Sequence, residues 1–376
     1  MYNEVDNMIF IIIPIMLAIL TLLLFYNGKN ILVLLNSFIK INSSIFWIVF
    51  VLIQLLFIAC QFIPYRIAAL LSGYFMGFTF YYFLINLIFE IVKLFGIKIV
   101  GIEIIKISMT LLIMIIGTYS ANKIVIKNYD ISVNKEIDSL NIVMFSDVHL
   151  GYLIQDKYVD KIVAKVNSLN PDIVIIPGDF FDGAFSKTRN IDTVKDNLRK
   201  IKSKYGVYAS LGNHDLVKDK EQVREFFKEC NIILLDDDKI TVENITIIGR
   251  LDATPIDNFK QERKETIELM EGIDRNNFII LLDHKPTEID QAVAANVDLI
   301  VSGHTHKGQL FPGELVTNML FKVDYGYKKY NDTNVIVTSG VGYWGIPMRV
   351  LTNSEIVNIK VTSNRSDKKY VESIND

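Results

Sequence analysis

Charged side chains are distributed very unevenly along this chain, and this feature limits its fold more than any other. Residues 1–120 contain ten of the 81 charged side chains, and the following 256 residues contain the other 71. The apolar front contains four runs close to the ~20 residues that a helix needs to cross a bilayer. The sequence therefore predicts two parts, a membrane-embedded front and a water-soluble remainder with an ordinary charge content.

The apolar front predicts a bundle of about four transmembrane helices. The first run does not read as a cleaved signal sequence, because Glu4 and Asp6 stand where a basic region is expected and no small-residue cleavage site follows. The predicted spans lie near 9–26, 44–64, 67–92 and 104–121. The expected domains are a transmembrane domain at 1–125, a soluble domain at 126–362 and a polar tail at 363–376.

The lysines of the front bear on which side of the membrane the soluble domain occupies. Lys29 and Lys40 follow the first span, further lysines precede the fourth, and only Arg66 lies in the loop between the second and third. The positive-inside rule then favours a multi-pass protein of the cell membrane with an extracytoplasmic soluble domain. Three lysines directly after the fourth span argue for the opposite face: Lys123, Lys127 and Lys135.

From about residue 126, short β-branched apolar runs alternate with amphipathic segments. This alternation is typical of an α/β fold with a largely parallel sheet covered on both faces. A hairpin at 239–249 and the C-terminal strands are expected to form a second sheet. The other predicted strands are 141–145, 172–176, 206–210, 232–235, 278–282, 298–302 and 334–339, and the predicted helices are 156–168, 191–203, 220–229, 259–272 and 287–296.

All five histidines of the chain follow predicted strands, together with carboxylate and amide side chains. In open α/β sheets, chemically active groups collect at the carboxyl ends of the strands. Five scattered structural histidines would also fall on helices and exposed surfaces, so their shared setting favours one metal site. The residues at these strand ends are Asp147, His149, Asp179, Asn213, His214, Asp215, His284, His304 and His306.

The predicted ligands are imidazole nitrogens with carboxylate and amide oxygens, and no thiolate is among them. This set favours Mn²⁺, Fe or Zn²⁺ over a cysteine-rich structural zinc site. Its size suits two divalent metal ions, which at a separation of ~3.5–4 Å activate a water for displacement at phosphorus. Cys60 and Cys230 lie in different parts of the chain and are expected to be small apolar packing residues.

Five sequence blocks occur in a specific order: D-x-H at 147–149, G-D at 178–179, G-N-H-D at 212–215, a lone His284 and G-H-x-H at 303–306. This order resembles the calcineurin-like metallophosphoesterase family, and the resemblance covers about 140–362. The segments "GVGYWGIPMR" and "SEIVNIKV" are also similar to the ends of membrane-attached bacterial enzymes of the YkuE- and YaeI-like branch.

The resemblance implies a fold and a role for each residue. The fold is a four-layer α/β-β/α sandwich. His214 would contact the phosphoryl oxygen or protonate the leaving group, oriented by Asp215, although Gly-Asn is also a plain turn signal and Asp215 a plain helix cap. The implied ligands are Asp147, His149 and His306 for one metal, Asn213, His284 and His304 for the other, and Asp179 bridging both.

Four further residues are weaker candidates. Arg250 and Arg349 are expected to meet substrate phosphate or, equally well, to form ion pairs. Tyr343 and Trp344 would line the pocket, with core packing as the favoured alternative.

The function that follows is a membrane-anchored, dinuclear-metal phosphoesterase acting on a diester or pyrophosphate, with a lipid-linked substrate suggested by the apolar front. The alternative is a non-catalytic, metal-dependent binding or scaffolding module coupled to the membrane helices. Nucleic acid is not an expected partner, because the chain after residue 120 has a net charge of about −5 and no aromatic-basic stripe.

Overall fold

The structure is a computed structural model that describes residues 2–97, 99–183, 185–215, 220–252 and 263–364, except for the side chains of residues 2–17, 186 and 220. Its contacts divide the chain into two compact units, Met1–Gly117 and Thr118–Asp376. The change from one unit to the other falls close to the boundary that charge density predicts.

The N-terminal unit is helical. Its helices are α1 (Tyr2–Asn36), α2 (Ser43–Cys60), α3 (Arg66–Leu94) and α4 (Ile102–Asn122), and the last of these runs into the second unit. Among the described residues, α2, α3 and α4 are long and apolar enough to cross a membrane. The predicted span at 9–26 falls in α1, and the side chains of its first half, residues 9–17, lie outside the described ones, so that span stays a prediction.

The second unit contains two six-stranded sheets, both of mixed strand direction. In the first sheet, β2, β3, β4 and β5 run parallel, and the last strand of the chain lies between β1 and β2. In the second sheet, β7, β8, β9 and β11 run parallel between two antiparallel edge strands. The first sheet has the order β1 (Ile124–Val133), β12 (Ser354–Ser363), β2 (Leu140–Met144), β3 (Ile173–Pro177), β4 (Val207–Ser210), β5 (Ile233–Leu234), and the second β10 (Gly326–Tyr330), β11 (Thr333–Val337), β9 (Leu299–Ser302), β8 (Phe278–Leu282), β7 (Ile245–Gly249), β6 (Asp238–Val242).

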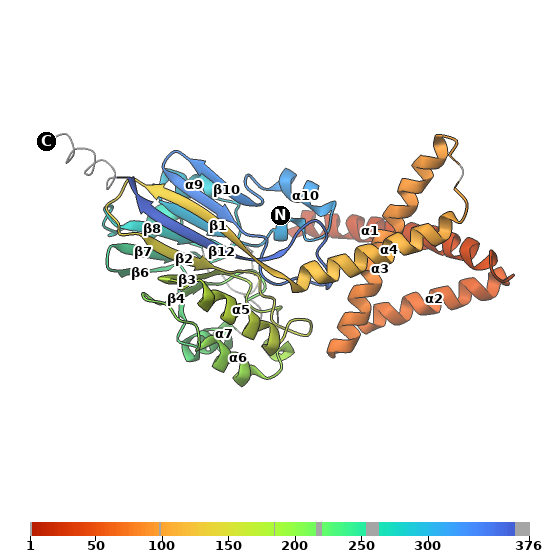
Figure 1. Ribbon diagram of the computed structural model, residues 1–376, viewed down its shortest axis with the longest axis horizontal. Coiled ribbons are helices and arrows are strands. Elements are labelled where there is room, and N and C mark those ends of the chain that lie inside the picture. The colour runs from red at the N-terminus through yellow and green to blue at the C-terminus, as the bar shows by residue number, and fades with distance from the viewer. Residues whose placement is uncertain (1, 98, 184, 216–219, 253–262, 365–376) are drawn as a thin grey trace. The chain divides into compact units, whose positions relative to one another are not determined.

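Three apolar clusters divide this unit into four layers. One cluster lies between the two sheets and includes Ile142 and Ile280, one from each sheet. Another joins the first sheet to its helices, and the third joins the second sheet to its own (Figure 1). The first set is α5 (Asp156–Ser168), α6 (Ile191–Leu198) and α7 (Lys220–Glu229), and the second is α8 (Thr266–Leu269) and α9 (Ile289–Ala294). The predicted four-layer α/β-β/α sandwich is confirmed.

Helix α5 shows why these segments are helical. Val159, Ile162, Val163 and Val166 recur at helical spacing, and all four are buried in the cluster beneath the helix. Its other face is polar, so that burying the apolar stripe against the sheet stabilises the helix.

Two predictions about the sheets need correction. The parallel strands do not form one sheet, because β8 and β9 pair with β7 rather than with β4. The C-terminal strand β12 joins the first sheet rather than the second. In this interior position Ile356 packs on the helix side and Val357 and Ile359 pack between the sheets, so that both faces of the strand are buried.

The remaining elements are short and connect strands near one end of the sandwich. They are the 3₁₀ helices η1 (Phe185–Lys187) and η2 (His306–Gly308) and the helix α10 (Gly313–Leu320).

Candidate metal centre

The predicted ligands come together where strands of both sheets end. Asp147 and His149 follow β2, and Asp179 follows β3, whose partner β4 is followed by Asn213 and His214. The second sheet contributes His284 after β8, and His304 and His306 after β9. Loops from two stacked sheets therefore build one site, as the positions of the strand ends predict.

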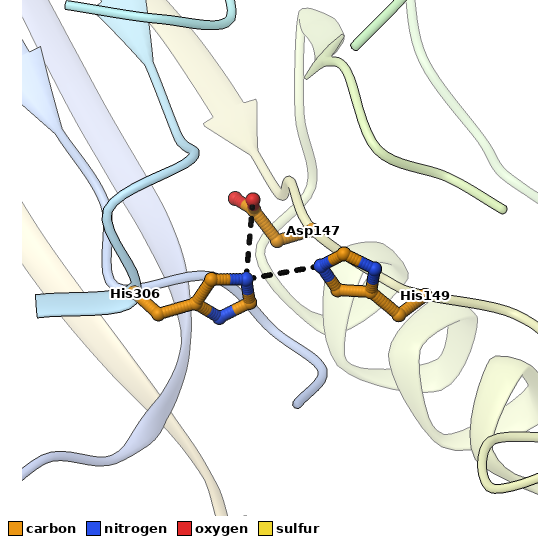
Figure 2. Close-up of side chains that lie close together, drawn as sticks. All are labelled: Asp147, His149 and His306. Carbon is orange, nitrogen blue, oxygen red and sulfur yellow. Dashed lines mark hydrogen bonds and ion pairs between the residues drawn. The ribbon is translucent and has the colours of Figure 1, made fainter. Parts of the chain in front are cut away.

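One group of donor atoms is formed by Asp147, His149 and His306 (Figure 2). The Nε2 atoms of His149 and His306 lie 3.0 Å apart, and His306 Nε2 lies 3.5 Å from Asp147 Oδ1. Donors that each lie ~2.0–2.2 Å from one ion are separated by about this distance. The three side chains thus converge on a point, as ligands of a single ion do.

A second group is formed by Asp179, His284 and His304. Asp179 Oδ2 lies 3.2 Å from His284 Nε2 and 3.9 Å from His149 Nε2, a residue of the first group. The Asp179 carboxylate therefore stands between the two groups of donors.

Two oxygens show that these donors are not satisfied by the protein. Asp147 Oδ2 and Asn213 Oδ1 are buried and have no hydrogen-bond partner among the described residues. A buried polar atom without a partner is costly, and a cation removes that cost. Asn213 Oδ1 is thus left to accept a cation, and a donor set of imidazole, carboxylate and amide fits the divalent ions that the sequence predicts.

Other oxygens of the same carboxylates are held by backbone N–H groups. The amide of His304 donates to Asp147 Oδ1 at 2.9 Å, and the amide of His214 donates to Asp179 Oδ1 at 2.8 Å. Asp179 is thus held through Oδ1 and turns its Oδ2 towards the centre, whereas Asp147 Oδ1 both accepts the His304 N–H and faces His306.

The ligand loops have a strained backbone. A non-glycine residue with positive φ costs of order 1–3 kcal/mol and persists where its surroundings hold it, most often at functional sites. Five of the predicted ligands have this conformation, with φ between 50° and 69°: Asp147, His149, Asp179, His304 and His306.

Two glycines make room for the carboxylates. A Cβ atom on Gly212 would lie 2.2 Å from Asp179 Oδ1, and one on Gly303 would lie 2.1 Å from Asp147 Oδ2. The glycines of the G-N-H-D and G-H-x-H blocks are therefore required by packing against the ligands.

Burial keeps three imidazoles neutral. It lowers the pKa of His149 to about 3 and of His304 to about 4, and it also holds the pKa of His306 well below its usual range. Burial opposes the charge on His284 as well, but the adjacent Asp179 carboxylate outweighs this and raises the pKa of His284 to about 10. Neutral imidazole is the metal-binding form. Three of the imidazoles are therefore ready to bind an ion, whereas His284 would lose a proton on binding one.

His214 lies at the edge of the centre. Its ring is 4.9 Å from the ring of His149 and 5.7 Å from the indole of Trp344, and its side chain is about a quarter exposed. His214 Nδ1 lies 3.6 Å from Asp182 Oδ1. The imidazole is therefore anchored on one side and accessible on another.

The predicted pairing of Asp215 with His214 is not what the structure contains. Asp215 is buried, and its carboxylate accepts hydrogen bonds from the backbone amides of Phe180, Phe181 and Gly212. These bonds join the loop after β3 to the loop after β4, while Asp182 takes the position beside His214. The signal for Asp182 was present in the sequence, because it follows Asp179 by three residues at the same strand end.

Neither predicted substrate arginine presents its guanidinium to open space. Arg349 is fully buried; its Nη2 donates to the carbonyls of Ser339 and Gly342 at 2.6 Å and lies 3.1 Å from His306 Nδ1. Arg250 is also buried and pairs with Asp283 and Glu288. The structure thus favours the ion-pair alternative for Arg250 and assigns Arg349 to holding the loop behind His306.

The two aromatic residues after β11 have different environments, one in the core and one beside the site. Tyr343 is buried in the core cluster beneath the first sheet, whereas Trp344 is 55% exposed beside His214. Gln309, which the sequence analysis missed, fixes Trp344 by accepting its backbone N–H at 2.9 Å and donating to its carbonyl at 2.9 Å.

Comparisons with known proteins agree with this site. Residues 140–308 match the family model described as calcineurin-like phosphoesterase. A protein of Helicobacter pylori (strain ATCC 700392 / 26695) described as an uncharacterized metallophosphoesterase is 33% identical over 240 residues, which cover 63% of this chain and 63% of that protein. The chain thus spans somewhat less than two thirds of this relative's length.

Two further similarities were found. A Danio rerio protein described as a transmembrane protein with metallophosphoesterase domain is 34% identical over 246 residues, covering 61% of this chain and 55% of that protein. The solved structure of a 5'-nucleotidase precursor from Thermus thermophilus is 16% identical, with a TM-score of 0.34, over 59% of this chain and 55% of that chain.

Proposed function

We propose that this chain, which carries a calcineurin-like metallophosphoesterase domain, uses two divalent metal ions to hydrolyse a phosphodiester or pyrophosphate at a membrane. Mn²⁺, Fe or Zn²⁺ would be held by Asp147, His149 and His306 on one side and by Asn213, His284 and His304 on the other. The chain's apolar helices would anchor it as a multi-pass protein, with its catalytic half outside the cytoplasm.

The single observation that carries the proposal is the position of Asp179. Its Oδ2 lies 3.2 Å from His284 Nε2 and 3.9 Å from His149 Nε2, so that one carboxylate faces both groups of donors. A site that binds a single ion does not require a carboxylate between two groups of imidazoles. When bound, a pair of ions lowers the pKa of a water and neutralises the charge of the phosphoryl oxygens.

The chain's own residues supply the remaining chemistry. His214 lies beside the first group of donors, and Asp182, 3.6 Å from its Nδ1, stabilises the protonated imidazole. A protonated His214 stabilises negative charge on the phosphoryl group or donates a proton to the leaving oxygen. Arg349 and the strained loops hold the ligands in place, so the site is formed before substrate binds.

Two features support the substrate class. The membrane-length helices of the same chain favour a substrate held at a lipid surface, and the exposed indole of Trp344 beside His214 offers an apolar contact to a leaving group. The net charge of about −5 after residue 120 does not favour nucleic acid.

The test uses the full chain in detergent, stripped of metal and supplied with Mn²⁺, Fe²⁺ or Zn²⁺. Turnover of bis-(p-nitrophenyl) phosphate and p-nitrophenyl phosphate is measured for the wild type, Asp179→Asn and His304→Ala. We expect a metal to restore diester turnover and both substitutions to abolish it. Asp192→Asn, which alters a carboxylate exposed on α6, is the matched control and should leave turnover unchanged.

Metal stoichiometry separates the proposal from its alternative. Two ions per chain with turnover support a dinuclear hydrolase. Metal binding without turnover of either substrate, or of diester lipids after reconstitution, would instead favour the non-catalytic binding module.

A further inference from the structure

Helix α10 has the sequence GELVTNML and begins five residues after the 3₁₀ helix that carries His306. Its large apolar residues are Leu315, Val316, Met319 and Leu320. At 3.6 residues per turn, these positions share one side of the helix, and Glu314, Thr317 and Asn318 occupy the other.

The apolar side of α10 faces outward. Met319 is 87% exposed and Leu320 is 71% exposed, and no residue of this fully described helix is buried. The polar side instead makes contacts with the protein: Thr317 Oγ1 donates to Asp324 Oδ2 at 3.1 Å, and Glu314 lies 3.5 Å from Lys307 Nζ. The helix therefore has the reverse of the orientation seen in α5, whose apolar side faces the core.

Another exposed apolar residue lies in a segment that pairs with the residues just before the helix. Leu310, which precedes α10 by three residues, forms a β-bridge with Val350, and the next residue, Leu351, is 70% exposed. Leu351 also has a φ of 59°, an unfavourable backbone conformation for a leucine. We call these exposed residues the α10 surface: Leu315, Val316, Met319, Leu320 and Leu351.

Both ends of α10 are attached to metal ligands. At its start, Gly308 packs so closely on the helix that a Cβ would lie 2.1 Å from the backbone nitrogen of Glu314, and Gly308 follows His306 by two residues. At its end, the ring of Phe321 meets the ring of His304 edge to face, with centroids 5.8 Å apart. A partner of the α10 surface is thereby held next to the metal centre.

The flanks of the α10 surface are basic. Residues 306–330 contain four lysines, of which Lys307 pairs with Glu314 and Lys322 with Asp290, while Lys328 and Lys329 are exposed on β10. Lys328 Nζ donates to the carbonyl of Lys322, the second residue after α10, at 3.3 Å. An apolar helix face with lysines beside it is the pattern of segments that lie in an anionic lipid interface.

We propose that the α10 surface docks onto the lipid bilayer that holds the chain's own membrane-length helices. Chain connectivity supports this occupant, because α4 is of membrane-spanning length and only Lys123 separates it from β1 of the catalytic half. Docking itself requires no turnover. The further consequence, that the phosphoester acted upon lies at the bilayer surface, rests on the proposed function.

The test places a fluorescent label on the full chain in membranes. A Cys60→Ala, Cys230→Ala background carries Met319→Cys labelled with bimane and is reconstituted in phosphatidylcholine–phosphatidylglycerol vesicles. A label ~5–10 Å below the headgroups meets nitroxides carried high on the acyl chains. We therefore expect it to lose most of its fluorescence to nitroxide lipids and little to aqueous iodide.

The matched control is Ile267→Cys on α8, where the native isoleucine is also exposed, at 58%. Its label should show the opposite response, quenching by iodide and not by lipid. Replacing Leu315 and Leu320 with glutamate in the Met319→Cys chain should shift that label towards iodide quenching.

Two results would overturn the docking. Iodide quenching at both positions would leave the α10 surface in water. Shielding of the Met319 label from both quenchers would show that protein covers it, either a second copy or the chain's own helices. The labelled chains need no activity, so either result leaves the hydrolytic proposal to be judged by its own assay.

Discussion

Two groups of charged residues, most of them buried, meet at the end of β8, and their charges are compensated in different ways. Asp283 belongs to an arginine cluster, which we define as Arg250, Arg263, Asp283 and Glu288. Each of its charges faces an opposite one: Arg263 Nη2 lies 2.6 Å from Asp283 and 3.1 Å from Glu288, and Arg250 Nη1 lies 2.8 Å from Glu288.

The next residue, His284, belongs to the metal centre, where a protonated His284 balances only one of the two ligand carboxylates, Asp147 and Asp179. Asp147 and Asp179 face imidazoles rather than guanidinium groups, and burial keeps most of those imidazoles neutral. The comparison teaches that burial and charge alone do not identify a functional site. A metal site is a group whose donor atoms converge on one point without enough positively charged side chains to balance their negative charge.

The largest effect is expected at the metal centre. Asp179→Asn should lower diester turnover by about 10³-fold or more, because its carboxylate faces both groups of donors and would help to hold an ion at each. Folding should survive, since an amide oxygen can still accept the His214 N–H. The measurement is steady-state turnover together with the melting temperature of the metal-free protein; a variant that retains turnover would mean that Asp179 does not bridge.

A substitution in the arginine cluster should lower the free energy of unfolding rather than turnover. Asp283→Ala leaves two buried guanidinium groups facing one carboxylate and should cost about 3–5 kcal/mol of stability. The matched control is Asp290→Ala, which removes the surface partner of Lys322 and should cost less than about 1 kcal/mol. Thermal melts of both variants check this, and equal losses would contradict the distinction between the two environments.

Metal removal should destabilise the protein through the metal centre and not through the arginine cluster. An ion at about 100 times its Kd stabilises the protein that binds it by about 2.7 kcal/mol, so chelation should lower the melting temperature. The same chelation should not change the melting temperature of Asp179→Asn. An equal shift in both proteins would place the stabilising ion elsewhere.

The smallest effect is expected at the edge of the centre. Asp182→Asn should lower kcat by about tenfold to a hundredfold without changing metal affinity, because it acts through His214. Asp215→Asn should reduce thermal stability more than kcat, since its partners are backbone amides. If Asp215→Asn proved the more damaging to kcat, the predicted orienting role of Asp215 would be restored.

Much of the fold and the site could be predicted from the sequence, because the information is local. Each ligand follows an apolar, β-branched strand, and neighbouring parallel strands end at the same edge of a sheet, so the meeting of His149 with Asp179 required no knowledge of loop geometry. The left-handed backbone of five ligand residues and the packing of Gly212 and Gly303 against the carboxylates are seen only in the structure.

The rest depended on contacts between distant residues. Nothing within 354–361 indicates which sheet that strand enters, because its side chains suit any position buried on both faces. Asp182 and Asp215 both lie within three residues of a predicted ligand, and only the paths of the two loops assign one to His214 and the other to backbone amides. The outward face of α10 is also invisible in sequence, where the same pattern predicts a helix packed on a core.

The place of β12 in the first sheet has a consequence for how the chain is made. Ile124 in β1 pairs with Ser354 in β12, and among the described strands β12 is the only one beside β1. At ~5–20 residues per second, a ribosome needs about 12–46 s to synthesise the intervening residues. Throughout that interval, the segment that follows the last membrane-length helix has an open edge, which invites pairing with other chains. A premature stop codon shortly before residue 354 would leave the edge of β1 unpaired permanently. The truncated chains should therefore aggregate or be degraded by proteases.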